Sequence, residues 1–333
     1  MNRMELYLGL DVGSVSVNLV LMDGKCNVLE KLYLRTEGKP IPVLRDGLDR
    51  MCRSMPAGCA IAGVGVTGSG RELANALVDA DVVKNEITAH GMAVLHCVPD
   101  AQTILEIGGQ DSKIILLRNG IVTDFAMNTV CAAGTGSFLD RQAARLNIPI
   151  QEFGNMALQS DSPVRIAGRC AVFAESDMIH KQQMGCSSGD IIKGLCEALV
   201  RNYLNNVGKG KEILPQIVFQ GGVAANAGIK KSFEEVLGQP VLVPEHYDVM
   251  GALGAGILAK METQKGRATH FRGFHAIPED FHAQTFACSG CPNLCEVVEI
   301  TSGGSVRARW GGRCGKWGVT AEQEHPAELD HLA

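Results

Sequence analysis

Two glycine-containing turns in this 333-residue chain combine polar side chains with exposed backbone in a pattern that suits phosphate chemistry. The first follows the β-rich run Glu5 to Leu10, and its residues are Asp11, Gly13, Ser14, Val15 and Ser16. If the chain returns from this turn as a second strand, Leu19 to Met22, the turn amides can cradle a phosphate while Asp11 faces a metal ion. The same residues, taken alone, also fit an ordinary tight turn.

The second turn follows the apolar run Thr103 to Leu105 and contains Gly108, Gly109, Gln110 and Asp111. Paired glycines after a strand let backbone N–H groups approach a phosphate closely. A related unit comes later, where the strand Gln216 to Gln220 runs into Gly221 and Gly222 before the helix Ala227 to Leu237. A strand, a glycine pair and a helix in this order suit the close approach of a nucleotide's adenosine part.

Cys131 and Cys170 share a second kind of setting, because each lies at the expected start of a helix. Exposed amides and the helix dipole favour the thiolate at such a position, which suits it to hold a metal. A lone cysteine can equally be a small buried apolar residue. The remaining cysteines before residue 266 lack this setting and are interpreted as core or incidental thiols.

Four further cysteines, Cys288, Cys291, Cys295 and Cys314, form a Cys-x2-Cys-x3-Cys group with one later member. Thiols rarely cluster so closely by chance, so the spacing indicates a metal site. An iron–sulfur cluster and a structural Zn²⁺ site both use four cysteine ligands and both stay open at this point. The composition also shifts at Gly266 toward basic and aromatic residues with little helical periodicity, so we predict a Cys-rich extension over 266–320 and a polar tail over 321–333.

The composition of the chain limits its class and its partners. With 46% hydrophobic and 20% charged residues it can bury a sizeable core in two or three lobes, and its net charge of -5 gives no general attraction to nucleic acid or to anionic membranes. The apolar runs are too short to span a bilayer, and the N-terminus does not resemble a signal peptide. We therefore expect a cytoplasmic protein whose twelve cysteines are thiols or metal ligands.

The secondary-structure pattern predicts a duplicated architecture for residues 1–265. Strands are expected at Glu5 to Leu10, Cys59 to Thr67 and Gln216 to Gln220, with helices at Ser137 to Leu146 and Asp248 to Met261. Two halves that each open with β-rich turns and close with helices indicate an α/β fold with a nucleotide cleft between its lobes. A Rossmann fold is disfavoured, because its G-x-G-x-x-G motif is missing after the first strand.

The ordered turns, together with Gly251-Ala252, resemble the phosphate and adenosine motifs of the acetate kinase, sugar kinase, Hsp70 and actin superfamily. This resemblance implies a duplicated, ribonuclease H-like, two-lobed ATPase. The stretches NEITAH, IGGQDSK, VCAAGTGSFLD and GRCAVFAES are similar to those of a narrower group, the ATP-dependent activators of 2-hydroxyacyl-CoA dehydratases and the ATPase subunits of benzoyl-CoA reductases. The similarity covers about Glu5 to Met261.

For the nucleotide, the resemblance implies that ATP-Mg²⁺ binds between the lobes. Asp11 and Asp111 would act on the Mg²⁺ ion or its waters, and Gln110 would orient the attacking water. Asp140 is a nucleotide contact by analogy with the family. The backbone contacts would come from Gly13, Ser14, Gly108 and Gly109 at the phosphates, and from Gln220, Gly221 and Gly222 at the adenosine. Asn18 departs from the family pattern, in which lysine is frequent, and this difference bears on the rate of turnover.

For the cysteines, the resemblance implies a homodimer that shares one 4Fe-4S cluster, with Cys131 and Cys170 as ligands from each chain. Nucleotide-driven closure would pass an electron at low potential to a partner dehydratase or reductase, with ferredoxin or flavodoxin as donor. Two alternatives stay open at this point. One is a small-molecule, sugar-type kinase of the same superfamily, and the other is a nucleotide or redox sensor without catalytic turnover.

Overall fold

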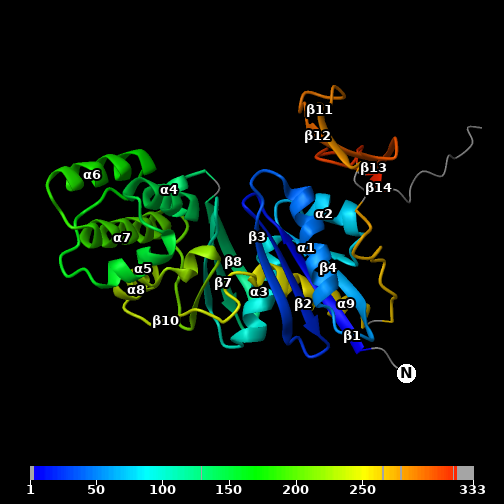
Figure 1. Ribbon diagram of the computed structural model, residues 1–333, viewed down its shortest axis with the longest axis horizontal. Coiled ribbons are helices and arrows are strands. Elements are labelled where there is room, and N and C mark those ends of the chain that lie inside the picture. The colour runs from blue at the N-terminus through cyan, green and yellow to red at the C-terminus, as the bar shows by residue number, and fades with distance from the viewer. Residues whose placement is uncertain (1–3, 129, 265, 278–279, 318, 321–333) are drawn as a thin grey trace, which may run out of the picture.

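Two lobes lie side by side in the computed structural model, with a small third sheet above one of them (Figure 1). The structure describes residues 4–128, 130–264, 266–277, 280–317 and 319–320. The predicted tail, 321–333, lies outside these described residues.

Lobe I is built on a five-stranded sheet in the order β3-β2-β1-β4-β5. The first three strands are antiparallel neighbours, whereas β4 runs parallel to β1 and β5 parallel to β4. Residues Leu6 to Leu10 are buried without alternation, as expected for a central strand that is covered on both faces. The strands are β1 (Met4–Val12), β2 (Ser16–Asp23), β3 (Val28–Arg35), β4 (Cys59–Thr67) and β5 (Val82–Val83).

Lobe II repeats this topology, because its sheet has the order β8-β7-β6-β9-β10 with the same pattern of antiparallel and parallel neighbours. The predicted duplicated, ribonuclease H-like α/β architecture is therefore confirmed. The strands are β6 (Thr103–Ile107), β7 (Ser112–Arg118), β8 (Ile121–Asn128), β9 (Ile217–Gln220) and β10 (Val241–Leu242).

Two helices, α3 (Glu86–Cys97) and α9 (Met250–Thr263), lie between the two sheets (Figure 1). Asn85 caps α3 by accepting a hydrogen bond from the N–H of Thr88 at 2.9 Å. Glycines allow α9 to lie directly on lobe I, since a Cβ added to Gly9 would collide with the carbonyl oxygen of Ala252. A single core cluster thus joins the inner faces of both sheets through these helices.

The outer faces of the sheets are covered by the remaining helices. In lobe I these are α1 (Pro40–Ser54) and α2 (Arg71–Val78), which pack on apolar side chains of β1, β2 and β4. In lobe II the helices pack on β6, β7 and β9. They are α4 (Gly136–Leu146), α5 (Ile150–Leu158), α6 (Ala171–Gln183), α7 (Ser188–Asn206) and α8 (Ala227–Leu237), with short 3-10 turns η1 (Ala132–Gly134) and η2 (Gly222–Ala225).

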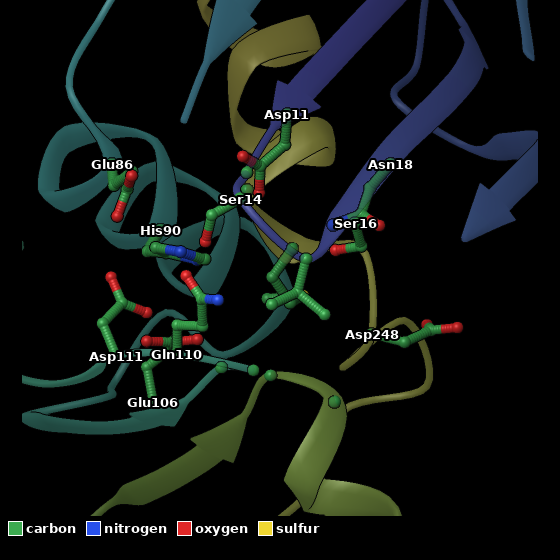
Figure 2. Close-up of a pocket in the computed structure, with 18 of the residues that line it drawn as sticks. Asp11, Ser14, Ser16, Asn18, Glu86, His90, Glu106, Gln110, Asp111 and Asp248 are labelled. Carbon is green, nitrogen blue, oxygen red and sulfur yellow. The ribbon is translucent and has the colours of Figure 1, made fainter. Parts of the chain in front are cut away.

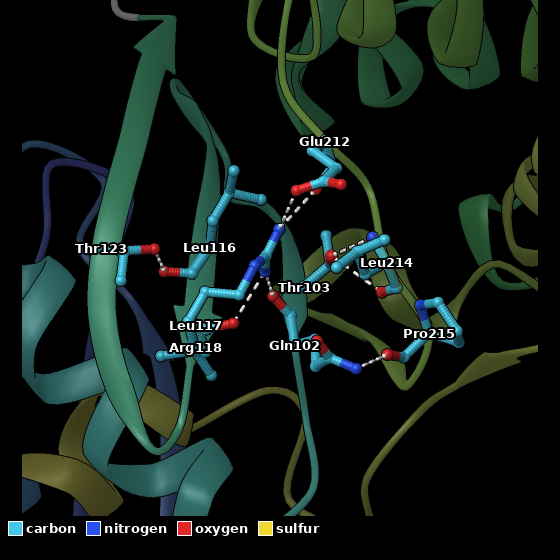
Figure 3. Close-up of polar contacts among 9 residues, drawn as sticks. All are labelled: Gln102, Thr103, Leu116, Leu117, Arg118, Thr123, Glu212, Leu214 and Pro215. Atoms are coloured by element: carbon cyan, nitrogen blue, oxygen red, sulfur yellow. Dashed lines mark hydrogen bonds and ion pairs between the residues drawn. The ribbon is translucent and has the colours of Figure 1, made fainter.

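Polar contacts at one end of the lobe II sheet fix the segment that enters β9 (Figure 3). Arg118 donates from its guanidinium to the backbone carbonyls of Gln102 and Glu212, at 3.1 and 3.0 Å. The hydroxyl of Thr103 donates to the carbonyl of Leu214 at 2.9 Å and accepts from its N–H at 3.0 Å. These bonds set the position of β9 beside β6, and the glycine pair 221–222 follows directly from β9.

A four-stranded antiparallel sheet forms the C-terminal part, in the order β11-β12-β13-β14. Residues 266–277, which we call the strap, tie it to lobe I. Phe271 and Phe274 of the strap pack on the lobe I core, and Asp81 accepts hydrogen bonds from the Thr269 hydroxyl at 2.7 Å and the His270 N–H at 2.8 Å. The strands are β11 (His282–Ala287), β12 (Glu296–Ser302), β13 (Ser305–Trp310) and β14 (Val319–Thr320). The domain boundary expected at residue 266 stays a prediction.

Candidate functional site

The two predicted phosphate turns face each other across the cleft between the lobes. Each closes a hairpin: the N–H of Gly13 donates to the carbonyl of Ser16 at 2.9 Å, and that of Gly108 to the carbonyl of Asp111 at 3.0 Å. A Cβ added to Gly109 would lie 2.8 Å from the side chain of Val15, so the turns of the two lobes nearly touch. Glycine is required at this point because a larger residue would push the lobes apart.

Two adjoining hollows occupy the cleft, and we call the first the acidic hollow (Figure 2). It brings together most of the predicted nucleotide-site residues, with further polar groups that the sequence analysis did not assign. The predicted residues that line it are Asp11, Gly13, Ser14, Val15, Ser16, Gly108, Gly109, Gln110, Asp111, Gly221 and Gly222. The unassigned ones include Glu86, His90, Glu106, Lys113 and Asp248.

Lys113 is the charged centre of the acidic hollow. Its side chain is only 3% exposed, and its ammonium lies 2.8 Å from both Glu86 and Asp111 and 3.2 Å from Glu106. Burial by itself lowers the pKa of Lys113, but the three carboxylates outweigh burial and raise it above its usual value. One buried cation therefore holds three acidic side chains from α3, β6 and the β6–β7 turn in a single arrangement.

Asp11 lies at the end of β1, enclosed by glycines on both sides. A Cβ on Gly68 would lie 2.6 Å from one carboxylate oxygen of Asp11, and a Cβ on Gly251 would collide with the other. Burial, together with the negative charge of Glu86, raises the pKa of Asp11 to about 7, although Lys113 opposes this shift. Because the buried Asp11 carboxylate is costly to ionise, a cation or a polar ligand that enters the hollow would stabilise its charged form.

Glu106 and His90 are perturbed by the same environment. Burial raises the pKa of Glu106 to about 8 despite its contact with Lys113. Burial and then the positive charge of Lys113 lower the pKa of His90 to about 3, so the imidazole is neutral. Its Nδ1 atom lies 2.8 Å from the amide nitrogen of Gln220. Gln220, predicted to lie against the adenosine, is fully buried, and its side chain contacts His90 instead of lining either hollow.

The second hollow has a volume of about 320 Å³ and begins where the acidic hollow ends. It is lined by apolar side chains such as Leu139 and Ile150 and by polar groups such as Gln151 and Asn226. An elongated ligand with a charged end and a flat, less polar end fits the two hollows in sequence. Asp140 lies at this second hollow, where it forms a cross-lobe ion pair with Arg35 at 3.1 Å, and its role as a nucleotide contact stays a prediction.

The acidic hollow is rich in side-chain oxygen atoms. Five carboxylates line the hollow and offer the kind of oxygen ligand that Mg²⁺ prefers, although no three of them converge on one metal-binding position: Asp11, Glu86, Glu106, Asp111 and Asp248. The side-chain carbonyl oxygen of Asn18, which also lines the hollow, is buried and makes no hydrogen bond among the described residues. The residues therefore fit a Mg²⁺–nucleotide.

Cys131 and Cys170 lie in neighbouring loops of lobe II and precede the helical segments η1 and α6. Asn202 of α7 links the loops, because its amide nitrogen donates to the carbonyl of Gly168 at 2.6 Å and lies 3.7 Å from the Cys131 sulfur. A Cβ on Gly134 would lie 2.7 Å from the side-chain oxygen of Asn202. The glycine in VCAAGTG thus permits the close approach that brings the loops together.

Exposed apolar side chains flank the two cysteines. Val130 is 95% exposed, and Val172 and Phe173 are 69% and 65% exposed. Apolar residues this accessible, next to two partly buried thiols, are typical of a surface that another protein covers.

The four cysteines of the extension lie in the turns of the third sheet. Cys288, Cys291 and Cys295 belong to the turn between β11 and β12, and Cys314 belongs to the turn between β13 and β14. Within the described residues, no three Cys, His, Asp or Glu side chains already converge on one metal-binding position. The metal roles predicted for these cysteines and for Cys131 and Cys170 stay predictions.

The helices of the described residues contain no segment with the length and apolar character needed to cross a membrane.

The duplicated sheets, with an acidic cleft between them, define a two-lobed α/β fold with a candidate nucleotide site. The chain belongs to the BadF/BadG/BcrA/BcrD ATPase family, whose model matches residues 8–259. It is 33% identical over 267 residues to the (R)-2-hydroxyglutaryl-CoA dehydratase activating ATPase of Acidaminococcus fermentans, which covers 79% of this chain and 100% of that protein.

Two solved structures resemble the chain over most of its length. Component A of the Acidaminococcus fermentans (R)-2-hydroxyglutaryl-CoA dehydratase is 30% identical, with a TM-score of 0.73 over 78% of this chain and 99% of that one. The activator of the 2-hydroxyisocaproyl-CoA dehydratase from Clostridium difficile, with bound ADPNP, is 30% identical, with a TM-score of 0.69 over 78% and 96%. The family match ends at residue 259, before the strap and the third sheet.

Proposed function

We propose that the chain hydrolyses ATP to drive one-electron transfer from a 4Fe-4S cluster, shared by two copies of the chain, to a 2-hydroxyacyl-CoA dehydratase or a related reductase. The names of the relatives support the role of an activator. The observation that carries the proposal is a direct structural link between the nucleotide cleft and the loop of Cys131.

This link consists of backbone and side-chain hydrogen bonds at the start of α4. The N–H of Gly136 donates to the carbonyl of Gly108 at 2.9 Å, and both the N–H and the hydroxyl of Ser137 donate to the carbonyl of Gly109, at 2.9 and 2.6 Å. A movement of this glycine turn on phosphate binding would therefore reach Gly136 and Ser137, which follow Cys131 through the short turn η1. A rigid connection of this kind can convert nucleotide state into a change of thiol position.

At the nucleotide end, the residues have complementary tasks. The amides of the two glycine turns that do not close the hairpins would bind the phosphates, and Asp11 and Asp111 would hold Mg²⁺ or its waters. Gln110 would orient the attacking water, while Lys113 keeps Asp111 in place. The second hollow would take the nucleoside, with Asp140 released from Arg35 to contact it.

At the other end, the donor set fits a cluster that lies between two subunits. Cys131 and Cys170 supply two thiols from one copy, and a two-fold axis through this surface would supply two more. The cluster would provide a one-electron carrier, reduced by ferredoxin or flavodoxin. Neither cysteine caps its helix with a side-chain hydrogen bond, and the Cys131 sulfur makes only long contacts, with the Asn202 amide at 3.7 Å and the Arg169 carbonyl at 3.9 Å. Val130, Val172 and Phe173 would become buried in the homodimer.

All twelve cysteines are free thiols, as a reducing cytoplasm would keep them.

The proposal is tested by purifying the protein without oxygen and measuring iron, sulfide, oligomeric state and ATP hydrolysis. We expect about four iron atoms per dimer in protein whose extension cysteines are replaced by serine, and no iron after the further change Cys131→Ser or Cys170→Ser. Cys97→Ser is the matched control, because Cys97 is an exposed cysteine far along the chain from both loops. Iron-free, monomeric wild-type protein would contradict the cluster.

The coupling is tested with the change Ser137→Ala, which removes one of the three bonds to the glycine turn. We expect unchanged iron content, but a smaller change in the visible spectrum or redox potential of the cluster when ATP is added. An unaltered response to ATP would show that this link does not transmit the nucleotide state.

Sugar phosphorylation by the wild-type protein would favour the kinase alternative, and ATP binding without hydrolysis would favour the sensor.

A further inference from the structure

The extension carries chemistry that the proposed ATPase and electron-transfer function does not use. Its two cysteine-bearing turns leave the third sheet at the same end. The pair Val298 and Trp310 lies opposite in the β12–β13 ladder, so the beginning of β12, after Cys295, lies beside the end of β13, before Cys314. A Cβ on Gly311 would collide with the carbonyl oxygen of Glu296, which shows how closely the second turn passes the first.

The first turn is shaped to present sulfur on one side. The N–H of Cys288 donates to the carbonyl of Cys295 at 2.8 Å, which continues the β11–β12 register by one pair. Residues directly opposite each other in an antiparallel ladder place their side chains on the same face. Cys288 and Cys295 therefore share a face, and Cys291 lies in the turn between them.

The Cys288 sulfur is already surrounded by hydrogen-bond donors from both turns. The N–H of Gly290 lies 3.5 Å from this sulfur, and the indole N–H of Trp317, from the Cys314 turn, lies 3.2 Å away. Donors of this kind are the outer-shell groups that stabilise a metal-bound thiolate. Lys316 of the second turn lies near Gly290 and brings positive charge to a site that four thiolates would make negative.

The sheet also has too small a core to be stable by itself. Among its described residues, the buried apolar side chains other than Cys288 are Val297, Ile300 and Ala308. Segments below roughly 40 residues usually need a disulfide, a metal or a partner to fold. No disulfide is present, because all four cysteines are free thiols.

We propose that four cysteines together bind one thiophilic metal centre, which cross-links the two turns of the third sheet. They are Cys288, Cys291, Cys295 and Cys314. Because no three of the described ligands yet converge on one point, binding must draw the side chains of the two turns together. The centre is separate from Cys131 and Cys170, which belong to lobe II, whereas the strap fastens the third sheet to lobe I.

The test uses full-length protein in which Cys131 and Cys170 are both replaced by serine, so that no shared cluster contributes metal. We expect either about one Zn²⁺ per chain without colour, or iron and sulfide in equal amounts with visible absorption, and these two results distinguish a single ion from a cluster. Additional Cys288→Ser and Cys314→Ser changes should abolish this metal, whereas Cys97→Ser should leave it unchanged.

A second readout does not depend on the folding of variants. Both tryptophans of the chain, Trp310 and Trp317, belong to the extension, so intrinsic tryptophan fluorescence reports on the extension alone. Removal of the metal from the parent protein should shift this emission and open residues 280–317 to protease, and Zn²⁺, or Fe²⁺ with sulfide, should restore both properties. The proposal is overturned if anaerobically purified and metal-supplemented protein binds no metal, or if the metal persists without Cys288 and Cys314.

Discussion

Replacement of Lys113 by methionine should strongly destabilise the protein, because Lys113 is the buried cation that neutralises the acidic hollow. The ammonium makes three contacts of 2.8 to 3.2 Å with carboxylates, and its side chain is 3% exposed. Removal of one partner of a buried charge pair typically costs about 3–5 kcal/mol, since the remaining charge is left uncompensated. We expect a loss of this size in the free energy of unfolding at alkaline pH.

The loss should become smaller as the pH falls. With Lys113 present, the pKa values of Glu106 and Asp11 are raised to about 8 and about 7, and without the lysine both rise further. The folded variant therefore takes up protons in the neutral range and escapes part of the repulsion. Lys113 itself stays charged throughout this range, because its folded pKa lies above the usual value for lysine, so the dependence on pH comes from the carboxylates.

The measurement is urea unfolding of the nucleotide-free protein at about pH 6 and about pH 8.5, which lie below and above the two raised pKa values. Lys31→Met is the matched control, because Lys31 also pairs with a carboxylate, Asp248, at 2.7 Å, but its side chain is 35% exposed. An ion pair this accessible should contribute only about 0–1 kcal/mol. The reasoning is refuted if Lys113→Met costs no more than Lys31→Met, or if its cost grows as the pH falls.

Three further outcomes follow from the packing and the pKa shifts. Gly9→Ala should lower the free energy of unfolding, measured in urea, by more than about 3 kcal/mol, because the new methyl group meets the backbone of α9. The control Gly24→Ala, whose Cβ meets nothing within 4 Å, should change it by less than about 0.5 kcal/mol. Similar losses of stability in the two variants would contradict the packing argument. Between about pH 4.5 and about pH 8, Glu106 binds fewer protons in the unfolded state than in the folded state, so the free energy of unfolding of the wild-type protein should fall as the pH rises. In Glu106→Gln this fall should be shallower. An equal slope in both proteins would show that Glu106 is not responsible. Burial raises the pKa of Cys196 to about 12, so its thiol should react slowly with iodoacetamide in the native protein, whereas the exposed Cys97 should be modified. Cys196 should react only after the protein is unfolded. Mass spectrometry of the peptides measures the modification of each cysteine.

The sequence predicted the elements of the cleft because those elements depend on local chemistry. The turns at Asp11 and at Gly108 were recognisable from glycine and polar residues after apolar strands, and both close hairpins in the structure. The helix expected at Ser137 to Leu146 begins one residue earlier, at Gly136. The helix expected at Asp248 to Met261 begins at Met250 and ends at Thr263.

Other features were out of reach because they depend on neighbours far apart in the chain. Lys113 stood inside the quoted motif IGGQDSK, but its contact with Glu86 joins β7 to a helix that precedes the second sheet. Asn202 carried no local signal, and its role appears only where α7 passes both cysteine loops. The four strands of the extension were not predicted, since short strands around cysteine-rich turns lack a clear apolar period.

The sequence by itself determined the duplicated α/β architecture, the two glycine turns and the positions of the cysteines, because strand periodicity, glycine and thiol spacing are properties of short segments. The tertiary structure decided which of these residues meet. It placed three carboxylates around one buried lysine, connected the Gly108 turn to the segment after Cys131, and set the two cysteine turns of the extension beside each other. These contacts form only when distant segments pack together, because the burial of a side chain and its neighbours in space, and not its residue type alone, decide its pKa and its partners.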